Sequence, residues 1–208
     1  MGKFLNKKFT LGRKVILPLF LVISIQQLIC AQHINPFDSL EISIQLTQNL
    51  NHNTFHDFYE SKNGLNTSII TPFYFGYIQG SLHIEPFIGK KQDHRNFIGI
   101  HSNLIWGKQL NLSKKMKWYN GLGIGWYIFY FSEESYSSDE YFNPSIRESE
   151  LSRNYITQLN YSISEIVNIN LCIRYNTIST YKKINLTNTC LGISYLLRTP
   201  DWIKIFLE

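Results

Sequence analysis

Strict alternation of apolar and polar residues is the feature that most constrains how this chain folds. A period of two places successive side chains on opposite faces of a β-strand. In the first alternating segment, Ile42, Ile44 and Leu46 are separated by polar residues. The other segments are 68–78, 81–90, 96–106, 116–131, 153–164, 167–178 and 187–198. The sequence therefore predicts an all-β domain of eight half-buried strands.

Two kinds of architecture accommodate such strands. A soluble sandwich or lipocalin-like barrel turns the apolar faces inward, whereas a membrane barrel turns them toward lipid and fills its interior with polar and small residues. The apolar faces here are bulky in Trp, Tyr, Ile and Leu, and the opposite faces are rich in Gly, Ser, Asn, Gln and Thr. An eight-stranded barrel is only wide enough inside for side chains. We therefore predict, over residues 32–198, an eight-stranded antiparallel up-and-down transmembrane β-barrel with a filled polar lumen.

Segment 116–131 favours the membrane barrel most strongly. Gly121, Gly123 and Gly125 face away from the large side chains of this segment, which include Trp126. Glycines on the inner face leave room for long side chains from neighbouring strands and allow a strand to coil tightly. Aromatic residues make up 15% of the chain and charged residues only 17%, which is low for a soluble surface.

The N-terminus, residues 1–31, resembles a cleaved secretory signal peptide in the order of its parts. Five basic residues precede an apolar run over 15–25, and Ala31 offers a small residue at the cleavage point. A retained membrane anchor and a lipoprotein modified on Cys30 are the alternatives. Removal of this segment leaves equal numbers of basic and acidic residues, so the mature chain has no net charge. This balance argues against a nucleic-acid partner, which needs a basic patch on the folded domain.

The predicted connections alternate in length along the chain. They are 50–67, 79–80, 91–95, 107–115, 132–152, 165–166 and 179–186. The two longest are odd-numbered and the two tightest are even-numbered, so long loops are expected at one end of the barrel and short turns at the other. Outer-membrane barrels have long extracellular loops and short periplasmic turns. We therefore expect periplasmic N- and C-termini, with residues 199–208 as a short periplasmic tail, and we place Pro72 and Pro86 at bulges or strand ends.

Three stretches carry a resemblance to a known family. The signal ends in ICAQ, residues 83–91 read HIEPFIGKK, and residues 110–131 read LNLSKKMKWYNGLGIGWYIFYF. In these the chain resembles the outer-membrane β-barrel domain proteins common in Bacteroidetes-like bacteria, over nearly all of residues 39–198. The resemblance implies a Gram-negative outer membrane and the barrel-assembly machinery as partner, and it implies no shared chemistry. The last strand departs from this class because it ends in Leu196 and Leu197 rather than in an aromatic residue.

Charged residues of the predicted lumen are the first candidate site. Strand parity places Glu41, His83 and Glu85 inside the barrel, and Arg174 enters from the far side. Because an unpaired buried charge is costly, we expect these groups to pair structurally. A membrane-embedded lipid-modifying enzyme would need a nucleophile beside an oriented base, and no local motif of that kind is present. We predict no catalytic activity and no cofactor, with that enzyme and a periplasmic lipocalin-like ligand-binding barrel as alternatives.

The two cysteines of the mature chain form a second candidate feature. Cys172 and Cys190 have the same strand parity and lie almost symmetrically about the loop near residue 181. Since the envelope outside the inner membrane is oxidising, we hypothesise a disulfide across the last hairpin. Two small, unbonded lumen residues are the alternative.

The long loops 50–67 and 132–152 are the third candidate region. His52 and His56 lie four residues apart in the first, a spacing that chelates a metal on a helix. That loop has no helical pattern, so we predict no metal site. The second loop is rich in acidic residues. Both loops are candidate binding surfaces for an extracellular partner, and a structural, adhesive or surface-interaction role is the predicted function.

Overall fold

The computed structural model describes residues 36–50, 53–91, 94–131 and 147–207. The predicted signal peptide, with Cys30, lies outside the described residues, and its cleavage stays a prediction. In the part of the chain that is described, no helix has the length and hydropathy needed to cross a membrane.

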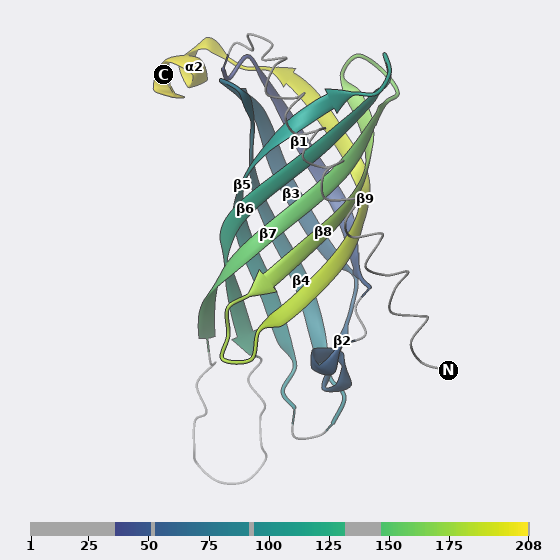
Figure 1. Ribbon diagram of the computed structural model, residues 1–208, viewed down its shortest axis with the longest axis vertical. Coiled ribbons are helices and arrows are strands. Elements are labelled where there is room, and N and C mark those ends of the chain that lie inside the picture. The colour runs from purple at the N-terminus through teal and green to yellow at the C-terminus, as the bar shows by residue number, and fades with distance from the viewer. Residues whose placement is uncertain (1–35, 51–52, 92–93, 132–146, 208) are drawn as a thin grey trace, which may run out of the picture. The chain divides into compact units, whose positions relative to one another are not determined.

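Eight long strands form a closed antiparallel barrel, which confirms the predicted fold (Figure 1). Every strand pairs with its neighbours in the chain, and the last pairs with the first over eleven residues from Ser39↔Arg198 to Asn49↔Asn188. Closure of this kind leaves no strand edge in the barrel unpaired. The strands are β1 (Ser39–Asn49), β3 (Gly64–Phe73), β4 (Gly76–Gly89), β5 (Phe97–Asn111), β6 (Met116–Phe131), β7 (Arg147–Ser162), β8 (Val167–Ile178) and β9 (Ile184–Arg198).

The two faces of the barrel are reversed relative to a soluble protein. Leu46, Leu122 and Ile193 project outward and are 68%, 67% and 61% exposed. On the inner face, Gln45 and Arg174 are completely buried. The alternation in the sequence therefore separates an apolar exterior from a polar interior. This is the arrangement predicted from the small interior of an eight-stranded barrel.

Strand β6 is thin on its inner face because of its alternate glycines. A Cβ atom at Gly125 would collide with the backbone carbonyl of Ser102 and with the side chain of Asn103, so the neighbouring strand approaches closely there. This space lets side chains of β5 and β7 meet across β6: His101 Nε2 lies 2.5 Å from Ser152 Oγ. This contact agrees with the prediction that the glycines leave room for long side chains from neighbouring strands.

The second predicted turn was wrong. Gln79 and Gly80, the expected turn 79–80, lie inside β4, and the chain reverses instead at Tyr74 and Phe75. Tyr74 adopts a positive φ of 43°, a conformation that usually falls to Gly or Asn. The predicted strand 68–78 therefore combines the second half of β3 with the first residues of β4.

Two further boundaries differ from prediction and make the alternation of loop lengths clearer. Strand β5 continues to Asn111, so the fourth connection shrinks from 107–115 to 112–115. Strand β7 begins at Arg147, inside the predicted loop 132–152. The short connections 74–75, 112–115 and 163–166 share one end of the barrel with the C-terminal helix α2 (Asp201–Leu207), and we call it the turn end (Figure 1). At the opposite end, the loop end, β1, β4, β6 and β8 finish and β3, β5, β7 and β9 begin, and the described connection 179–183 lies there.

Each of the two prolines lies where its strand lacks a ladder partner on one side. Pro72 is the penultimate residue of β3, at the strand end that was predicted. Pro86 lies within β4, after its pairing with β3 ends at Ile84 and before the short strand β2 (Tyr59–Ser61) pairs with it from Phe87 onward. Because proline has no backbone N–H, it would break a hydrogen bond of a continuous ladder, but at position 86 there is none to break on the side of β3 and β2. The carbonyl of Pro86 still accepts a hydrogen bond from the Lys62 N–H at 2.9 Å.

Candidate functional site: the polar lumen and the loop end

Glu41 organises the lumen near the turn end. Ser194 Oγ donates to its carboxylate, and the side-chain amides of Asn168 and Asn170 lie at 3.4 and 3.5 Å from the same oxygen. Glu41 is only 7% exposed. Neutral donors of β8 and β9 therefore satisfy this buried carboxyl group.

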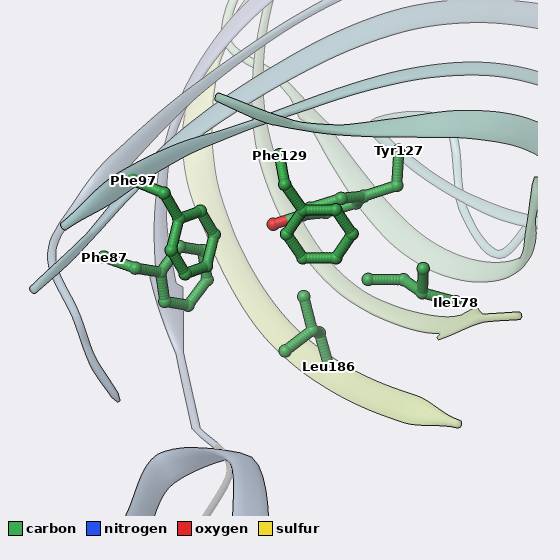
Figure 2. Close-up of a cluster of buried hydrophobic side chains, with 6 residues drawn as sticks. All are labelled: Phe87, Phe97, Tyr127, Phe129, Ile178 and Leu186. Carbon is green, nitrogen blue, oxygen red and sulfur yellow. The ribbon is translucent and has the colours of Figure 1, made fainter. Parts of the chain in front are cut away.

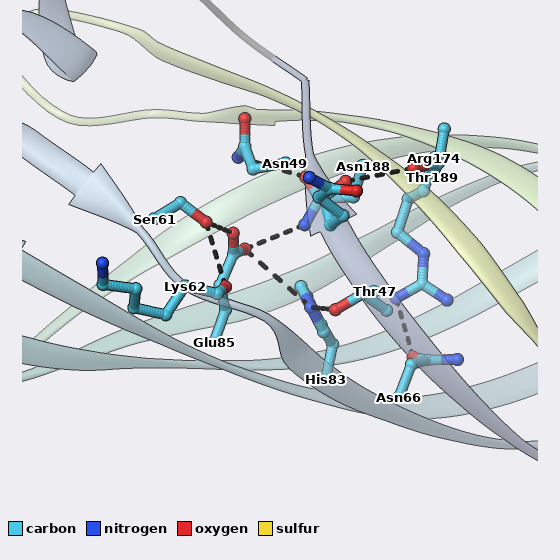
Figure 3. Close-up of polar contacts among 11 residues, drawn as sticks. Thr47, Asn49, Ser61, Lys62, Asn66, His83, Glu85, Arg174, Asn188 and Thr189 are labelled. Atoms are coloured by element: carbon cyan, nitrogen blue, oxygen red, sulfur yellow. Dashed lines mark hydrogen bonds and ion pairs between the residues drawn. The ribbon is translucent and has the colours of Figure 1, made fainter.

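His83 and Glu85 meet in the lumen, as Figure 3 shows. His83 Nε2 lies 2.8 Å from Thr47 Oγ1 and 3.8 Å from a Glu85 carboxylate oxygen. Ser61 Oγ also donates to Glu85, and Asn188 Nδ2 donates to it at 2.8 Å. The carboxylate is thus satisfied by hydroxyl and amide donors from two other strands.

Arg174 crosses the lumen to β3. Its Nη1 donates to Asn66 Oδ1 at 2.8 Å, and the side chain is completely buried (Figure 3). The four lumen residues predicted to pair do so only in part: His83 approaches Glu85, whereas Arg174 contacts an amide. Asn66 was missed because the sequence interpretation assigned its segment to the loop 50–67. The polar alternation of Asn66 and Ser68 was the available signal.

Cys172 and Cys190 lie directly opposite each other in the β8–β9 ladder. Both are 1% exposed, and both thiols are free in the structure. Cys172 Sγ is within 3.9 Å of Gln45 Oε1, which also accepts from Asn66 Nδ2 at 2.8 Å. The register places the two residues side by side, and the disulfide itself stays a prediction.

Two hydroxyl–imidazole pairs of the lumen, Thr47–His83 and Ser152–His101, resemble the beginning of a nucleophile and base arrangement. Sequence reasoning missed both pairs, because in each one the two residues lie on strands that are not neighbours. Ser152 and His101 are completely buried, and His83 is 2% exposed. Catalysis requires a substrate to reach the nucleophile, and this burial instead favours a structural role for both pairs.

An aromatic plug closes the lumen at the loop end (Figure 2). Phe87 and Phe97 stack with ring centroids 4.7 Å apart and an interplanar angle of 12°. The six buried members of the plug are Phe87, Phe97, Tyr127, Phe129, Ile178 and Leu186. Large apolar residues inside the barrel were not predicted, since the inner faces were expected to be polar or small. They continue the inward parity of their strands at the point where the barrel ends.

A small cap covers the plug. The 3₁₀ helix η1 (Thr54–Asp57) and β2 contribute Phe55 and Tyr59, whose rings stack at 5.2 Å and pack against Phe97. Asn53 begins η1 and ties it to the barrel by donating to the Asn185 carbonyl at 2.7 Å. Part of the predicted loop 50–67 is therefore ordered structure that closes the barrel.

The cap has charged side chains on its surface, but its described residues do not form a cluster of potential metal ligands. Lys62 Nζ lies 2.5 Å from a Glu60 carboxylate oxygen, and this hydrogen bond and charge hold the pKa of Glu60 below its usual range. His56 Nδ1 lies 2.8 Å from Asn53 Oδ1, while His52 is outside the described residues. Among the residues that are described, no three potential ligands gather around one point.

Solved structures of other proteins share this fold. No protein-family model and no curated protein sequence matches the chain. The N-terminal β-barrel domain of Pseudomonas aeruginosa OprF superposes with a TM-score of 0.51 at 12% identity, covering 78% of this chain and all of that one. Yersinia pestis Ail, the attachment invasion locus protein, in complex with the heparin analogue sucrose octasulfate gives 0.50 at 15% identity, covering 79% of this chain and all of that one. At such low identity these similarities establish the eight-stranded outer-membrane barrel fold.

Proposed function

We propose that this chain is an integral outer-membrane β-barrel protein with a structural, adhesive or surface-interaction role. The observation that carries the proposal is the reversal of faces, with Leu46 and Leu122 fully outward and Gln45 and Arg174 fully inward. Hydrocarbon is the solvent that suits such an exterior. The barrel-assembly machinery would insert it, and an origin in Bacteroidetes-like bacteria stays a prediction from the sequence resemblance.

The lumen supports neither of the alternative functions. A lipocalin-like ligand carrier needs an apolar interior, whereas residues such as Asn66, Asn170 and Asn188 line this one. A lipid-modifying enzyme needs its hydroxyl–imidazole pair open to lipid, and both pairs here are enclosed beneath the aromatic plug. Surface interaction is left to the loop end, where the segments 50–67 and 132–152 are the proposed contact regions for an extracellular partner.

Fractionation of cells together with gel mobility tests the proposal. We expect the protein in the outer-membrane fraction, resistant to carbonate extraction, with different mobilities before and after boiling in SDS. A closed barrel keeps its compact form in unboiled detergent. Release by carbonate and a single mobility would contradict it.

Cysteine labelling tests the proposed orientation of the barrel. In a Cys172→Ser/Cys190→Ser background, Lys182→Cys lies at the loop end, in connection 179–183, and Lys114→Cys lies in the turn 112–115. An impermeant maleimide is expected to label position 182 on intact cells and position 114 only after lysis. The reverse pattern would place the termini outside.

A further inference from the structure

A shallow apolar groove of about 180 Å³ runs along the outward face near the loop end, between β4 and β5. Its walls include Ile88, Ile98 and Tyr130, which are 41%, 41% and 44% exposed. Pro86 pairs directly with Ile98 across the two strands. The compact ring of proline lies between longer outward side chains of β4, which leaves the depression. The outward residues Pro86, Ile88 and Ile98 give this groove its opening on the outer face, and Phe87 and Phe97 of the aromatic plug also line it.

Cationic residues flank the groove along the chain, at the loop ends of β4 and β5. Lys90 and Lys91 follow β4 directly, and Arg95 comes just before β5. The side chain of Asn96, which lines the groove, accepts a hydrogen bond from the backbone N–H of Gly89 at 2.9 Å and so joins the two ends of this connection. The one acid of the connection, Asp93, lies outside the described residues.

A further cation comes from β7, and one described acid of this face is paired with a lysine. Arg147 is exposed and lies directly opposite Tyr130 in the ladder that joins β6 and β7, so the two share the outward face. Glu60 pairs with Ile88 and brings a carboxylate to the same face. Lys62 binds that carboxylate at 2.5 Å. Glu148, next to Arg147, is a second exposed acid. Lys90, Lys91, Arg95 and Arg147 therefore still leave the described part of the rim with excess positive charge.

We infer that this groove and its rim bind lipid A, a phosphorylated glycolipid, with an acyl chain in the groove and a phosphate held by Lys91, Arg95 and Arg147. Guanidinium groups match phosphate oxygens in bidentate geometry. Basic clusters at the edge of a membrane bind anionic lipid headgroups. The inference rests on the proposed outer-membrane location, because that membrane supplies this lipid in its outer leaflet.

Lipid titration of the detergent-purified protein, followed by native mass spectrometry, tests the charged part of the site. The triple variant Lys91→Gln/Arg95→Gln/Arg147→Gln is expected to bind bisphosphorylated lipid A at least about tenfold more weakly than the parent. A triple variant of equal charge change at the turn end, Lys114→Gln/Lys115→Gln/Lys117→Gln, is expected to bind like the parent. An equal loss in this control would overturn the inference.

Filling the groove tests the apolar part while leaving every charge in place. Ile98→Trp is expected to weaken lipid A binding, whereas Ile173→Trp, on the outward face of β8, is expected to leave it unchanged. Dephosphorylated lipid A and phosphatidylglycerol are expected to bind the parent protein weakly. Equal binding of either lipid, or no effect of Ile98→Trp, would overturn the assignment.

Cell fractionation of the parent and the Lys91/Arg95/Arg147 variant separates this inference from the proposed function. A parent protein found in the outer membrane that fails to retain lipid A in detergent would refute the lipid site alone. A parent protein absent from the outer membrane would refute the proposed function, whatever the binding measurements show.

Discussion

Glu85 is the residue through which the polar lumen is most directly tested. Its carboxylate accepts hydrogen bonds from Ser61 and Asn188, which come from strands far apart in the sequence. Replacement by Ala leaves buried donors without an acceptor, at a cost of about 1–3 kcal/mol in unfolding free energy. Urea unfolding in micelles, followed by tryptophan fluorescence, would measure this change.

Glu60 provides the matched control for that substitution. It is also a glutamate bound by hydrogen bonding, to Lys62, but its side chain is 56% exposed. Exposed ion pairs add little to stability. Glu60→Ala is therefore expected to unfold at nearly the urea concentration of the parent, and an equal destabilisation by both variants would show that burial is not the cause.

The inner-face glycines of β6 support a second prediction at this scale. Gly125→Ala places a methyl group against the Ser102 carbonyl, and such overpacking typically costs about 1–3 kcal/mol. Gly80 has no atom within 4 Å of the position that its Cβ would occupy, so Gly80→Ala should be neutral. Comparison of the two unfolding midpoints checks whether close strand approach, and not loss of glycine itself, matters.

At the scale of elements, the sequence predicted strands well and turns unevenly. Successive side chains of a strand point to opposite faces. The sequence therefore predicted which residues of β5, β6 and β8 face the lumen and which face outward. The turn at Tyr74 and Phe75 was not, because two aromatic residues replace the usual Gly, Asn or Asp. The Gln79–Gly80 pair offered a false turn signal inside β4.

The candidate site was less predictable than the fold for a related reason. The position of a residue in the alternating pattern predicts whether its side chain enters the lumen. It does not predict which strand across the lumen that side chain contacts. Arg174 meets Asn66 on β3, and His101 meets Ser152 across β6. These contacts depend on the shear of the barrel and on the lengths of individual side chains, neither of which a local pattern contains.

The hairpin of β8 and β9 contains both cysteines of the predicted disulfide. Because Cys172 and Cys190 are paired in register, protein isolated from the oxidising envelope is expected to show no free thiol when denatured without reductant and alkylated. Prior reduction should expose two thiols. Labelling of both cysteines in the unreduced sample would refute the disulfide and leave two small lumen residues.

Helix α2 provides a prediction of pH dependence. Lys204 Nζ donates to Asp38 at 2.8 Å, and this bond with its charge lowers the pKa of Asp38 from the usual 3.8. A lowered pKa means that the contact is present above the unfolded value and is lost as the pH falls through the folded value. Protection of the amides in residues 201–204, taken relative to the intrinsic exchange rate at each pH, should therefore decrease below about pH 4. In Lys204→Gln that pH dependence should disappear.

At the scale of the whole molecule, the reversal of faces determines which substitutions the barrel tolerates. Leu122 lies at the middle of β6 and faces outward. Leu122→Arg is expected to cost about 2–4 kcal/mol in lipid vesicles, whereas Leu197→Arg, near the turn-end terminus of β9, should cost about 0–1 kcal/mol. Equal costs at both depths, measured by refolding into vesicles, would argue against a membrane-spanning orientation.

The thin inner face of β6 has a consequence for how this sequence can change over time. His101 and Ser152 are separated by a whole strand but touch through the gap above its glycines. A substitution that enlarges residue 152 would therefore be tolerated only after a substitution that makes residue 101 smaller. Residues on adjacent strands are coupled in the same way. Among descendants of this chain, the histories of positions 101 and 152 should be linked, and that link should vanish in any lineage where a side chain has replaced the glycine at 125.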